Sequence, residues 1–499
     1  MHNNKVVVIG SGLGGLSSGV LLAKNGYNVT IIEQERQIGG CLQCFMRHGV
    51  KYETGMHFIG SADKGQTLNK LFRYLEISDK ICLSRLSTLA YDVVELNGRT
   101  YNFANGRDAF IEGLSSYFPK QGRNIAAYYD LVRKVASSSS LHSLKYAETN
   151  DAVNTEYQLR SIDDVISHTV DDPLLADVLA GNQPLYAAQL GKTPFSTHAF
   201  IRDFYDQSAF RVIGGSDGIA KALVEVLCQH GGKVLTRSKA TNIVCNDRIA
   251  TGVEINGEQL IDTDIVISDI HPMRTLELLD THLIRPAFRR RMASLPQTVG
   301  SFAVYLQFKD GEVPYMNSNY YAYNYGTPWN CEAYDDSTWP KGFLYMHLCH
   351  ESHPAFARSG VILSYMMFDE MQPWSGTSVG HRGPAYEDFK LRKAEKLIAE
   401  LERRWSGISN KIERYYTSTP LTYYDYTGTE GGSMYGIAKD ITLGVAGRIP
   451  QRTKVPNVFQ TGQNVNSHGI LGVLVGTIVT CSELLTSKRI YEQIIEANE

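Results

Sequence analysis

A glycine-rich segment near the start of the chain has the clearest chemical pattern. Gly10-Ser11-Gly12-Leu13-Gly14-Gly15 fits G-x-G-x-x-G, and Glu33 follows about 20 residues after the first glycine. In such a loop Gly10 allows a tight turn, Gly12 lets the backbone approach a diphosphate, and Gly15 lets a helix pack closely on a strand. Glu33 can accept hydrogen bonds from ribose hydroxyls. These residues predict a site for a dinucleotide.

The elements that must position these residues follow one another in the order that such a site requires. Residues 5–9 (KVVVI) form a short β-branched run that is typical of a buried parallel strand. Residues 16–25 are typical of a helix, and residues 28–32 (NVTII) of a second strand that ends at Glu33. The start of the helix would offer unpaired N–H groups and the positive end of its dipole to the phosphates. Strand, glycines, helix, strand and acid in this order predict an α/β dinucleotide-binding fold.

A second strand, turn and helix close the chain. Residues 455–462 (VPNVFQTG) are typical of a strand that ends on glycine, residues 463–469 of a polar turn, and residues 470–485 of a helix. This arrangement points another helix N-terminus toward the ligand. It suits a flavin, because the ribityl chain and the pyrimidine ring need hydrogen-bond donors.

The composition excludes several classes of protein. The chain has 499 residues, of which 43% are hydrophobic and 20% charged, so a disordered or fibrous protein is excluded. Its formal net charge of −3 leaves no basic footprint for nucleic acid. No apolar run reaches the roughly 18 residues of a membrane-spanning helix, and the eight cysteines are too dispersed for a disulfide scaffold. The first residues lack the features of a secretory signal, and we expect a cytoplasmic protein without a metal centre.

The residues after Glu33 indicate which dinucleotide is bound. Arg36 and Gly39-Gly40 complete the pattern Glu-x-x-Arg-x-x-Gly-Gly. This pattern resembles the extension of flavoproteins of the amine oxidase and phytoene desaturase type, where the arginine and the glycine pair lie against the FAD diphosphate. The resemblance implies FAD as the cofactor, because an enzyme that uses free NAD does not need these residues.

The resemblance extends over essentially the whole length of the chain. The chain resembles the phytoene desaturase and carotenoid isomerase superfamily, and most closely its retinol saturase branch. Beyond the opening fingerprint, the resemblance is carried by residues 49–60 (GVKYETGMHFIG), by Gly214-Gly215, by residues 418–436 and by Gly462-Gln463-Asn464. Gln463 stands where the broader superfamily usually has the aspartate that contacts the flavin chain, as in the saturase branch.

The resemblance implies an α/β protein with a Rossmann-like FAD-binding domain of the amine oxidase and phytoene desaturase type and an interleaved α+β substrate domain. The FAD-binding domain would be discontinuous, with residues 1–75, 205–275 and 410–499, and the substrate domain would take residues 76–204 and 276–409. The residues expected to contact FAD are Gly10, Ser11, Gly12, Leu13, Gly14, Gly15, Glu33, Gln34, Arg36, Gly39, Gly40, Met56, His57, Ala240, Thr241, Gly462, Gln463, Gly469, Ile470 and Leu471.

The reaction implied by the resemblance is hydride transfer at flavin N5. Members of the superfamily add or remove hydrogen across a carbon–carbon bond of an apolar polyene such as a retinoid or carotenoid, and the protein supplies placement and a proton. The candidate catalytic residues His57, Tyr52 and Glu53 lie in the segment that passes near the flavin in this superfamily. His57 is the first candidate for the proton donor, with a structural role in a turn as the alternative. Glu53 could donate a proton only if burial raised its pKa toward neutrality.

Several alternatives share these motifs. The same flavoprotein could be a carotenoid or phytoene desaturase, a cis-trans isomerase, an amine oxidase, or a non-catalytic escort that binds prenyl groups. Cys41 and Cys44 form a C-x-x-C pair, but redox chemistry normally places such a pair in a thioredoxin-like setting, so we expect two ordinary thiols. Seven tyrosines between Tyr315 and Tyr345 fit either a sheet core or the wall of an apolar pocket.

The expected partner is a hydrophobic polyene or isoprenoid molecule. Because such molecules partition into bilayers, we expect peripheral contact with the inner face of the membrane through exposed apolar residues around the mouth of a tunnel. No second nucleotide fingerprint identifies the electron donor or acceptor. The motifs leave the direction of the reaction open as well.

Overall fold

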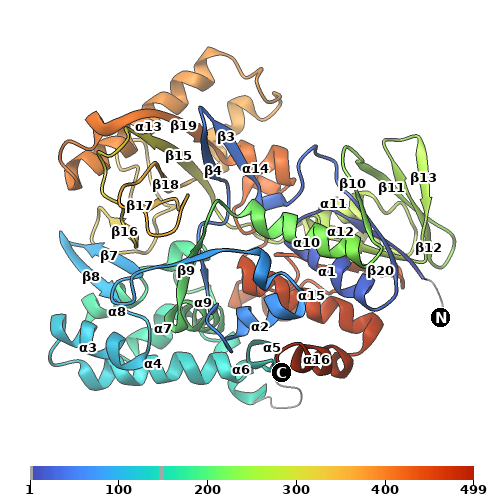
Figure 1. The fold of residues 1–499 in the computed structure, drawn as a ribbon, viewed down its shortest axis with the longest axis horizontal. Coiled ribbons are helices and arrows are strands. Elements are labelled where there is room, and N and C mark those ends of the chain that lie inside the picture. The colour runs from blue at the N-terminus through green and yellow to red at the C-terminus, as the bar shows by residue number, and fades with distance from the viewer. Residues whose placement is uncertain (1–3, 145–150) are drawn as a thin grey trace.

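Five parallel strands from three distant parts of the chain form the first sheet (Figure 1). The computed structural model describes residues 4–144 and 151–499. The sheet has the order β10-β2-β1-β14-β20, and all neighbouring strands are parallel. All five strands therefore end at the same edge, which is where open parallel sheets bind their ligands. The strands are β1 (Lys5–Ile9), β2 (Asn28–Ile32), β10 (Lys233–Leu235), β14 (Ile265–Ser268) and β20 (Val458–Gln460).

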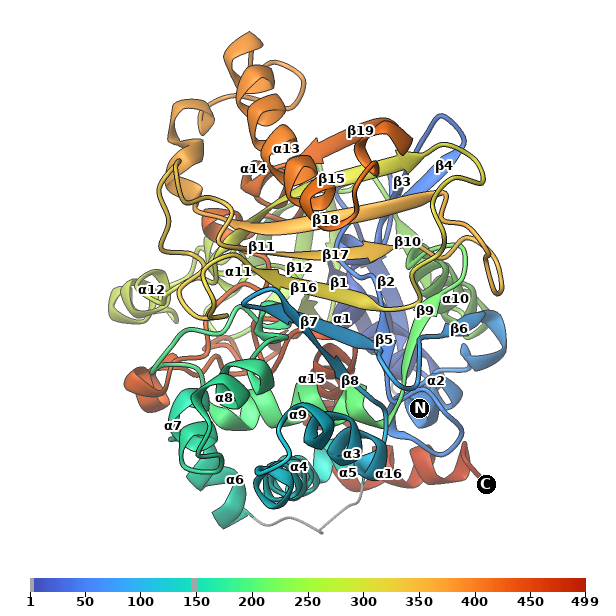
Figure 2. The same cartoon turned by 90° about the vertical axis from the view of Figure 1, so that its left-hand side faces the viewer.

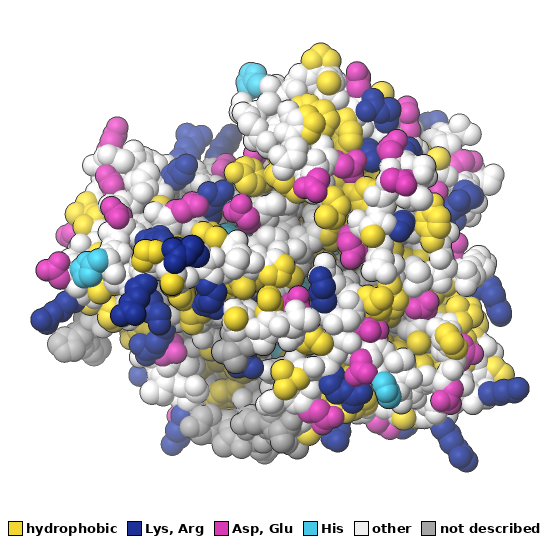
Figure 3. Space-filling view, turned by 180° about the vertical axis from the view of Figure 1, so that it is seen from behind, with side chains coloured by type: hydrophobic (Ala, Val, Ile, Leu, Met, Phe, Trp, Pro, Cys, Tyr) yellow, Lys and Arg dark blue, Asp and Glu magenta, His cyan; other side chains and the backbone are white. Residues whose placement is uncertain are grey.

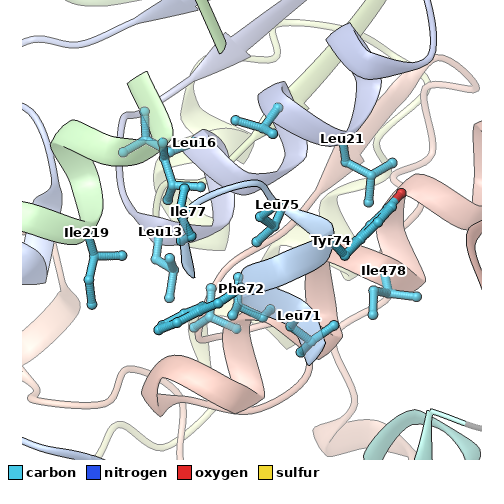
Figure 4. Packing of buried hydrophobic residues seen from close by; sticks show 14 of the residues in the cluster. Leu13, Leu16, Leu21, Leu71, Phe72, Tyr74, Leu75, Ile77, Ile219 and Ile478 are labelled. Carbon is cyan, nitrogen blue, oxygen red and sulfur yellow. The ribbon is translucent and has the colours of Figure 1, made fainter. Parts of the chain in front are cut away.

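Helices cover this sheet and bury its apolar side chains. α1 (Leu13–Lys24) connects β1 to β2 and packs against α10 (Asp217–Gln229) and α15 (Gly469–Leu485). Gly19 allows α1 to lie close to the sheet, because a methyl group there would stand 2.8 Å from Ile31 Cδ1. The helix α2 (Thr67–Tyr74) adds a further apolar layer. Figure 4 shows the buried side chains that fill this packing, among them Leu13, Leu16, Leu71, Phe72, Ile219 and Ile478.

A three-stranded antiparallel sheet is inserted between β10 and β14. Its last hairpin turns at Asn256-Gly257, where both φ angles are positive, 56° and 74°. Asn-Gly favours two-residue turns with positive φ, which accounts for the hairpin at this dipeptide. The strands are β11 (Ala240–Cys245), β12 (Ala250–Ile255) and β13 (Gln259–Asp262).

The second large sheet has seven strands in the order β19-β15-β18-β17-β16-β7-β8. Neighbouring strands are antiparallel except for β16 and β7, which are parallel. β19 pairs with β15, although it lies in the 410–499 segment expected in the FAD-binding domain. The strands are β7 (Asp92–Leu96), β8 (Arg99–Phe103), β15 (Gly300–Phe308), β16 (Asn319–Tyr323), β17 (Gly342–His347), β18 (Ser359–Met366) and β19 (Ile412–Ser418).

Both faces of the seven-stranded sheet are covered. Figure 2 shows α13 (Pro384–Arg404) on one side of it and the helices α3, α4 and α9 on the other. The strands β15 and β17 are consequently buried at every position. Beneath the sheet, the fully buried Arg202 of α9 pairs with Asp206 over 2.9 Å. The helices of this layer are α3 (Arg107–Tyr117), α4 (Gly122–Ser137), α5 (Ser140–Ser143), α6 (Asp151–Gln158), α7 (Ile162–Ser167), α8 (Pro173–Leu179) and α9 (Phe195–Gln207).

Short elements connect the two large sheets and finish the surface. Among residues 4–144 and 151–499, no helix combines the length and apolar character that crossing a bilayer requires. Figure 3 shows apolar, basic and acidic side chains interspersed on the face opposite that of Figure 1. The remaining elements are β3 (Cys44–Arg47), β4 (Val50–Glu53), β5 (Ile59–Gly60), β6 (Leu83–Arg85), β9 (Ala209–Val212), α11 (Pro272–Glu277), α12 (Pro286–Ala293), α14 (Pro420–Thr427) and α16 (Ser487–Glu496).

Candidate functional site

One cavity of about 600 Å³ extends from the end of the parallel sheet to the inner face of the seven-stranded sheet. The residues that follow β1, β2, β14 and β20 line one end of it, beginning with Gly10, Glu33, Asp269 and Thr461. Side chains of β17 and β18 line the other end. The cavity therefore joins the dinucleotide fingerprint to an interior wall of the second sheet.

The fingerprint loop lines the cavity at the start of α1. Gly10 has φ +97°, which glycine adopts without strain, and Gly12 is extended immediately before the helix. The backbone N–H and hydroxyl of Ser11 donate to Glu33 Oε2 over 3.0 and 2.6 Å. Glu33 is thus held at the end of β2 as a buried, oriented acceptor on the cavity wall. This is the arrangement that a ribose hydroxyl at the end of a dinucleotide requires.

The glycine pair after β2 packs directly on the fingerprint loop. Gly39 and Gly40 have φ angles of +112° and +54°, and the Gly39 N–H donates to the Ser11 carbonyl over 3.0 Å. A methyl group on Gly40 would stand 3.2 Å from Gly12 Cα. Both positions therefore favour glycine, and both line the cavity. Arg36 is exposed and does not reach the cavity wall.

The closing turn of the chain meets the fingerprint loop across the cavity. A methyl group on Gly14 would stand 2.9 Å from the Cα and N of Gly462, so glycine is needed for the two loops to touch. Gly462 and Gln463 line the cavity, as do Gly469 and Ile470 at the start of α15. The first and last parts of the sequence thus build one wall together.

Four of the residues expected to contact FAD are not on the cavity wall. Gly15 lies behind the fingerprint loop, where a side chain would collide with the Gly10 carbonyl. Thr241 is exposed, and its hydroxyl donates to the Glu254 carbonyl over 3.3 Å. Leu471 is buried in the core that α15 shares with α1. The fourth residue that is not on the cavity wall is the exposed Arg36. Gln34, Ala240, Met56 and His57 do line the cavity.

The far end of the cavity is apolar and aromatic. The hydroxyl of Tyr435 donates to the Pro184 carbonyl over 3.0 Å, and that of Tyr423 to the Thr54 carbonyl over 3.4 Å. The two hydroxyl groups are therefore hydrogen-bonded to the protein backbone, and the apolar rings are left to face the cavity. The residues of this compartment are Phe58, Leu185, Tyr205, Leu344, Leu363, Tyr423, Met434 and Tyr435.

The tyrosines of residues 315–345 do not form this wall. Tyr321 and Tyr323 are buried in the core between the sheet and the helices beneath it. Tyr345 lies in the core on the other face, against α13. The sheet-core interpretation holds for Tyr321, Tyr323 and Tyr345, whereas Tyr325 is exposed, and the aromatic wall comes from other parts of the sequence.

His57 is the one candidate catalytic residue that lines the cavity. Its Nδ1 lies 3.5 Å from Glu53 Oε2, and Arg211 donates from Nη1 to the His57 carbonyl over 3.2 Å. Glu53 is buried behind it and accepts from the Ser216 N–H over 3.0 Å. Burial raises the pKa of Glu53, while His57 and Arg211 oppose this shift. Tyr52 is fully buried and stacks on Phe45, with ring centroids 5.0 Å apart, so neither Tyr52 nor Glu53 reaches the cavity.

The two cysteines of the C-x-x-C pair lie at the edge of the site. Cys41 lines the cavity, whereas the Sγ of Cys44 lies 3.4 Å from Ser216 Oγ. Burial raises the pKa of Cys41 to about 11 and that of Cys44 to about 12. A reactive cysteine needs a lowered pKa, so this environment favours inert thiols. Within the described residues, no group of His, Cys, Asp and Glu side chains is arranged to hold a metal ion.

Asp269 lines the cavity beside the fingerprint loop, and the motifs do not reveal it. It follows β14, and its carboxylate fills the space between Gly12, Gly14 and Gly462. A methyl group on Gly12 would stand 2.5 Å from Asp269 Oδ2. Burial, together with the nearby Glu33, raises the pKa of Asp269 to about 7, while the hydrogen bond from the Gly15 backbone opposes this shift. The signal in the sequence was an acid immediately after a buried parallel strand, at the edge where ligands bind.

Comparison with known proteins agrees with this geometry. Residues 8–75 match the family of NAD(P)-binding Rossmann-like domains. The chain is 26% identical to all-trans-retinol 13,14-reductase of Rattus norvegicus, over 98% of this chain and 86% of the relative. It is 24% identical to prolycopene isomerase 1, chloroplastic, of an Oncidium hybrid cultivar, over 92% and 79%. It is 22% identical to phytoene desaturase (lycopene-forming) of Pseudescherichia vulneris, over 96% and 99%.

Solved structures share the fold. An oxidoreductase from Methanosarcina mazei superposes with a TM-score of 0.64 at 17% identity, covering 96% of this chain and 100% of the other. Putrescine oxidase superposes with a TM-score of 0.62 at 15% identity, covering 99% of each chain. These likenesses confirm the predicted fold class, a Rossmann-like domain with an interleaved α+β part.

Proposed function

We propose that the chain, which is similar to a retinol reductase, a prolycopene isomerase and a phytoene desaturase, binds FAD and adds hydrogen to a carbon–carbon double bond of an apolar polyene. The observation that carries the proposal is the single cavity that joins a dinucleotide cradle to an apolar compartment. An oxidoreductase of this kind must place a cofactor and a hydrophobic substrate in contact, and one continuous cavity allows that.

The residues around the cradle fit FAD. Gly12, Gly14 and Gly462 surround the Asp269 carboxylate and carry no Cβ atom, so their backbone lies bare at the place where a diphosphate would approach it. Residues 10–14 with Gly39-Gly40 would hold the diphosphate, and Glu33 with residues 238–240 the adenosine. Gly462, Gln463 and the start of α15 would hold the ribityl chain and the flavin ring. In this proposal residues 1–75, 205–275 and 410–499 supply the FAD-binding domain, apart from β19, which extends the seven-stranded sheet.

The chemistry divides between the cofactor and the wall of the cavity. FAD, when bound, supplies hydride transfer between flavin N5 and one carbon of the double bond. His57 supplies the proton for the other carbon, and we assign that proton to His57 Nε2. Glu53, behind His57 Nδ1, orients the ring, and the Arg211 bond to the His57 carbonyl fixes the backbone. Protonation by a positioned side chain typically contributes about 10²- to 10⁴-fold to the rate.

The lining of the far compartment supports a polyene as the substrate. Leu344 and Leu363 of the sheet and the rings of Tyr423 and Tyr435 offer apolar contact along its length. The tyrosine hydroxyls are already bonded to backbone carbonyls, so they demand no polar group of the substrate. Such a wall excludes water from the reacting bond. A retinoid or a carotenoid meets these requirements.

A reductive half-reaction followed in the spectrophotometer tests the proposal. The apoprotein is loaded with FAD, reduced anaerobically with dithionite and mixed with all-trans-retinol, with free reduced FAD as the control. We expect the bands of oxidised flavin to reappear while the polyene absorbance shifts to shorter wavelength. Reduced flavin that persists beside unchanged retinol would contradict retinol saturation. A protein that takes up no FAD would contradict the flavoprotein assignment and favour the prenyl-binding escort.

Desaturation is the second candidate, because the likeness to phytoene desaturase covers 99% of that relative. The same cavity serves removal of hydrogen when electrons flow from the substrate to the flavin. In this case the oxidised holoprotein is expected to bleach anaerobically with a more saturated polyene, and the polyene absorbance is expected to move to longer wavelength. Isomerisation would change the polyene spectrum without net bleaching of the flavin.

We also propose peripheral contact with a membrane surface. Tyr426 lines the cavity and is 47% exposed, so an aromatic side chain stands where the cavity approaches the protein surface. Aromatic residues are favoured at the boundary between lipid and water. Sedimentation with phospholipid vesicles is expected to carry the protein down, and to carry less of the variant Tyr426→Ser. Protein that stays wholly in the supernatant would contradict this contact.

A further inference from the structure

Asp269 places a carboxylate in the space that the proposed diphosphate needs. Its Oδ2 would stand 2.5 Å from a methyl group on Gly12, and its Oδ1 faces Gly14 and Gly462 in the same way. The Gly15 N–H at the start of α1 donates to this carboxylate. In the free protein Asp269 therefore occupies the helix N-terminus that an anionic ligand would use.

The surroundings of Asp269 add no compensating charge. Glu33 faces it from the end of β2, and Cys41 faces it from the turn after the glycine pair. Among the residues that the structure describes, no basic side chain contributes to the environment of the Asp269 carboxyl. A diphosphate entering the cradle would meet two carboxylates at once. Like charges in a partly buried site repel one another more strongly than they would in water.

We propose that Asp269 takes up one proton from solvent when a dinucleotide enters the cavity, so that its carboxyl group donates a hydrogen bond to the diphosphate instead of repelling it. The inference rests on the proposed binding of FAD. It assigns Asp269 as a positioning residue that couples cofactor binding to pH. The proton bound by the carboxyl is the only covalent change, and it comes from the medium.

The expected pH dependence follows from linkage. Burial raises the pKa of Asp269 in the free protein to about 7, and a bound diphosphate would raise this pKa further. Below pH 7 the carboxyl is already protonated, so the affinity for FAD is flat. Above pH 7 the binding of FAD must take up a proton. The affinity for FAD therefore falls about tenfold for each pH unit, until the pH reaches the pKa of Asp269 in the complex. Between about pH 6 and pH 8.5 the Kd is expected to rise about 30-fold.

Two other groups near the cavity do not titrate in this pH range, and a third is told apart from Asp269 by the variant. The pKa of Cys41 is raised to about 11, so it remains a thiol over this range. The pKa of His468 is lowered to about 4 by burial, so it remains neutral. Burial lowers the pKa of Lys439, near the closing turn, to about 8, and a titration of Lys439 would persist in any variant of Asp269.

Fluorescence titration of FAD into apoprotein at the two pH values tests the inference. Asp269→Asn keeps the shape and presents an amide N–H to the diphosphate, so its Kd is expected to be the same at both values. Glu277→Gln, a change at another carboxylate on the cavity wall, is expected to keep the wild-type rise. A flat Kd in the wild-type protein, or an equal rise in Asp269→Asn, would overturn the inference while FAD binding stands.

A calorimetric measurement keeps the test independent of the variants. FAD is titrated into wild-type apoprotein at about pH 8 in two buffers of different ionisation enthalpy. The difference between the binding enthalpies observed in the two buffers gives the number of protons taken up. We expect close to one proton per FAD, since about nine-tenths of Asp269 is ionised one pH unit above its pKa. No proton uptake would overturn the inference. Absence of FAD binding at every pH would overturn the proposed cofactor as well.

Discussion

Replacing Gly12 with aspartate is expected to abolish FAD binding while leaving the fold intact. Gly12 has φ −65°, which any residue adopts, and a Cβ atom there would meet only the Asp269 carboxyl group. The substitution therefore strains no backbone, but the Asp269 carboxyl group must shift to admit the new side chain. The new carboxylate nevertheless enters the cavity at the point where the diphosphate is expected.

The size of the effect follows from this geometry. Two unit charges about 4 Å apart repel by about 4 kcal/mol at an effective dielectric constant of about 20, which weakens the Kd about a thousandfold. Fluorescence titration of FAD into apoprotein measures the Kd, and circular dichroism checks the fold. Gly113→Asp is the matched control, because nothing lies within 4 Å of a Cβ atom at Gly113 in α3. Stoichiometric, tight FAD in Gly12→Asp would refute the assignment of the fingerprint.

Three further changes test other parts of the site. His57→Ala is expected to keep FAD bound but to slow turnover of the polyene about 10²-fold or more, and unchanged turnover would leave His57 a structural role. Leu363→Asn puts an amide on the apolar wall and is expected to raise the KM for the polyene about tenfold with the flavin spectrum unchanged; loss of FAD instead would place Leu363 in the cofactor site. The double change Cys41→Ser and Cys44→Ser is expected to keep turnover, because burial holds both as thiols; abolished turnover with FAD retained would revive the redox pair.

The parts of the site that could be predicted from the sequence are those whose residues lie close together in the chain and form one local structure. Gly10, Gly12 and Glu33 belong to one strand–helix–strand unit and the glycine pair follows directly after it, so their spacing in the sequence predicts their geometry. The Asn256-Gly257 hairpin was predictable for the same reason, since a two-residue turn depends on those two residues.

Predictions that depended on the direction of a side chain were less complete. Tyr52, Glu53 and His57 lie in one short segment, yet only His57 reaches the cavity, while Tyr52 and Glu53 are buried behind it. The spacing of the three residues does not predict the direction that the chain takes after β4, and this direction decides which side chain reaches the cavity. Arg36 likewise follows the pattern of the flavoproteins but is exposed at the surface.

The sequence by itself determined the nucleotide-binding unit and the resemblance from which the proposed chemistry follows, because both reside in short motifs whose residues are close in the chain. Only the tertiary structure decided the apolar compartment, since Leu344, Leu363, Tyr423 and Tyr435 come from separate elements. It also decided the place of Asp269, whose carboxylate reaches the fingerprint only because β14 pairs with β1. Strand order is set by the burial of whole faces and not by any local pattern, so contacts between distant strands emerge only when the chain has folded.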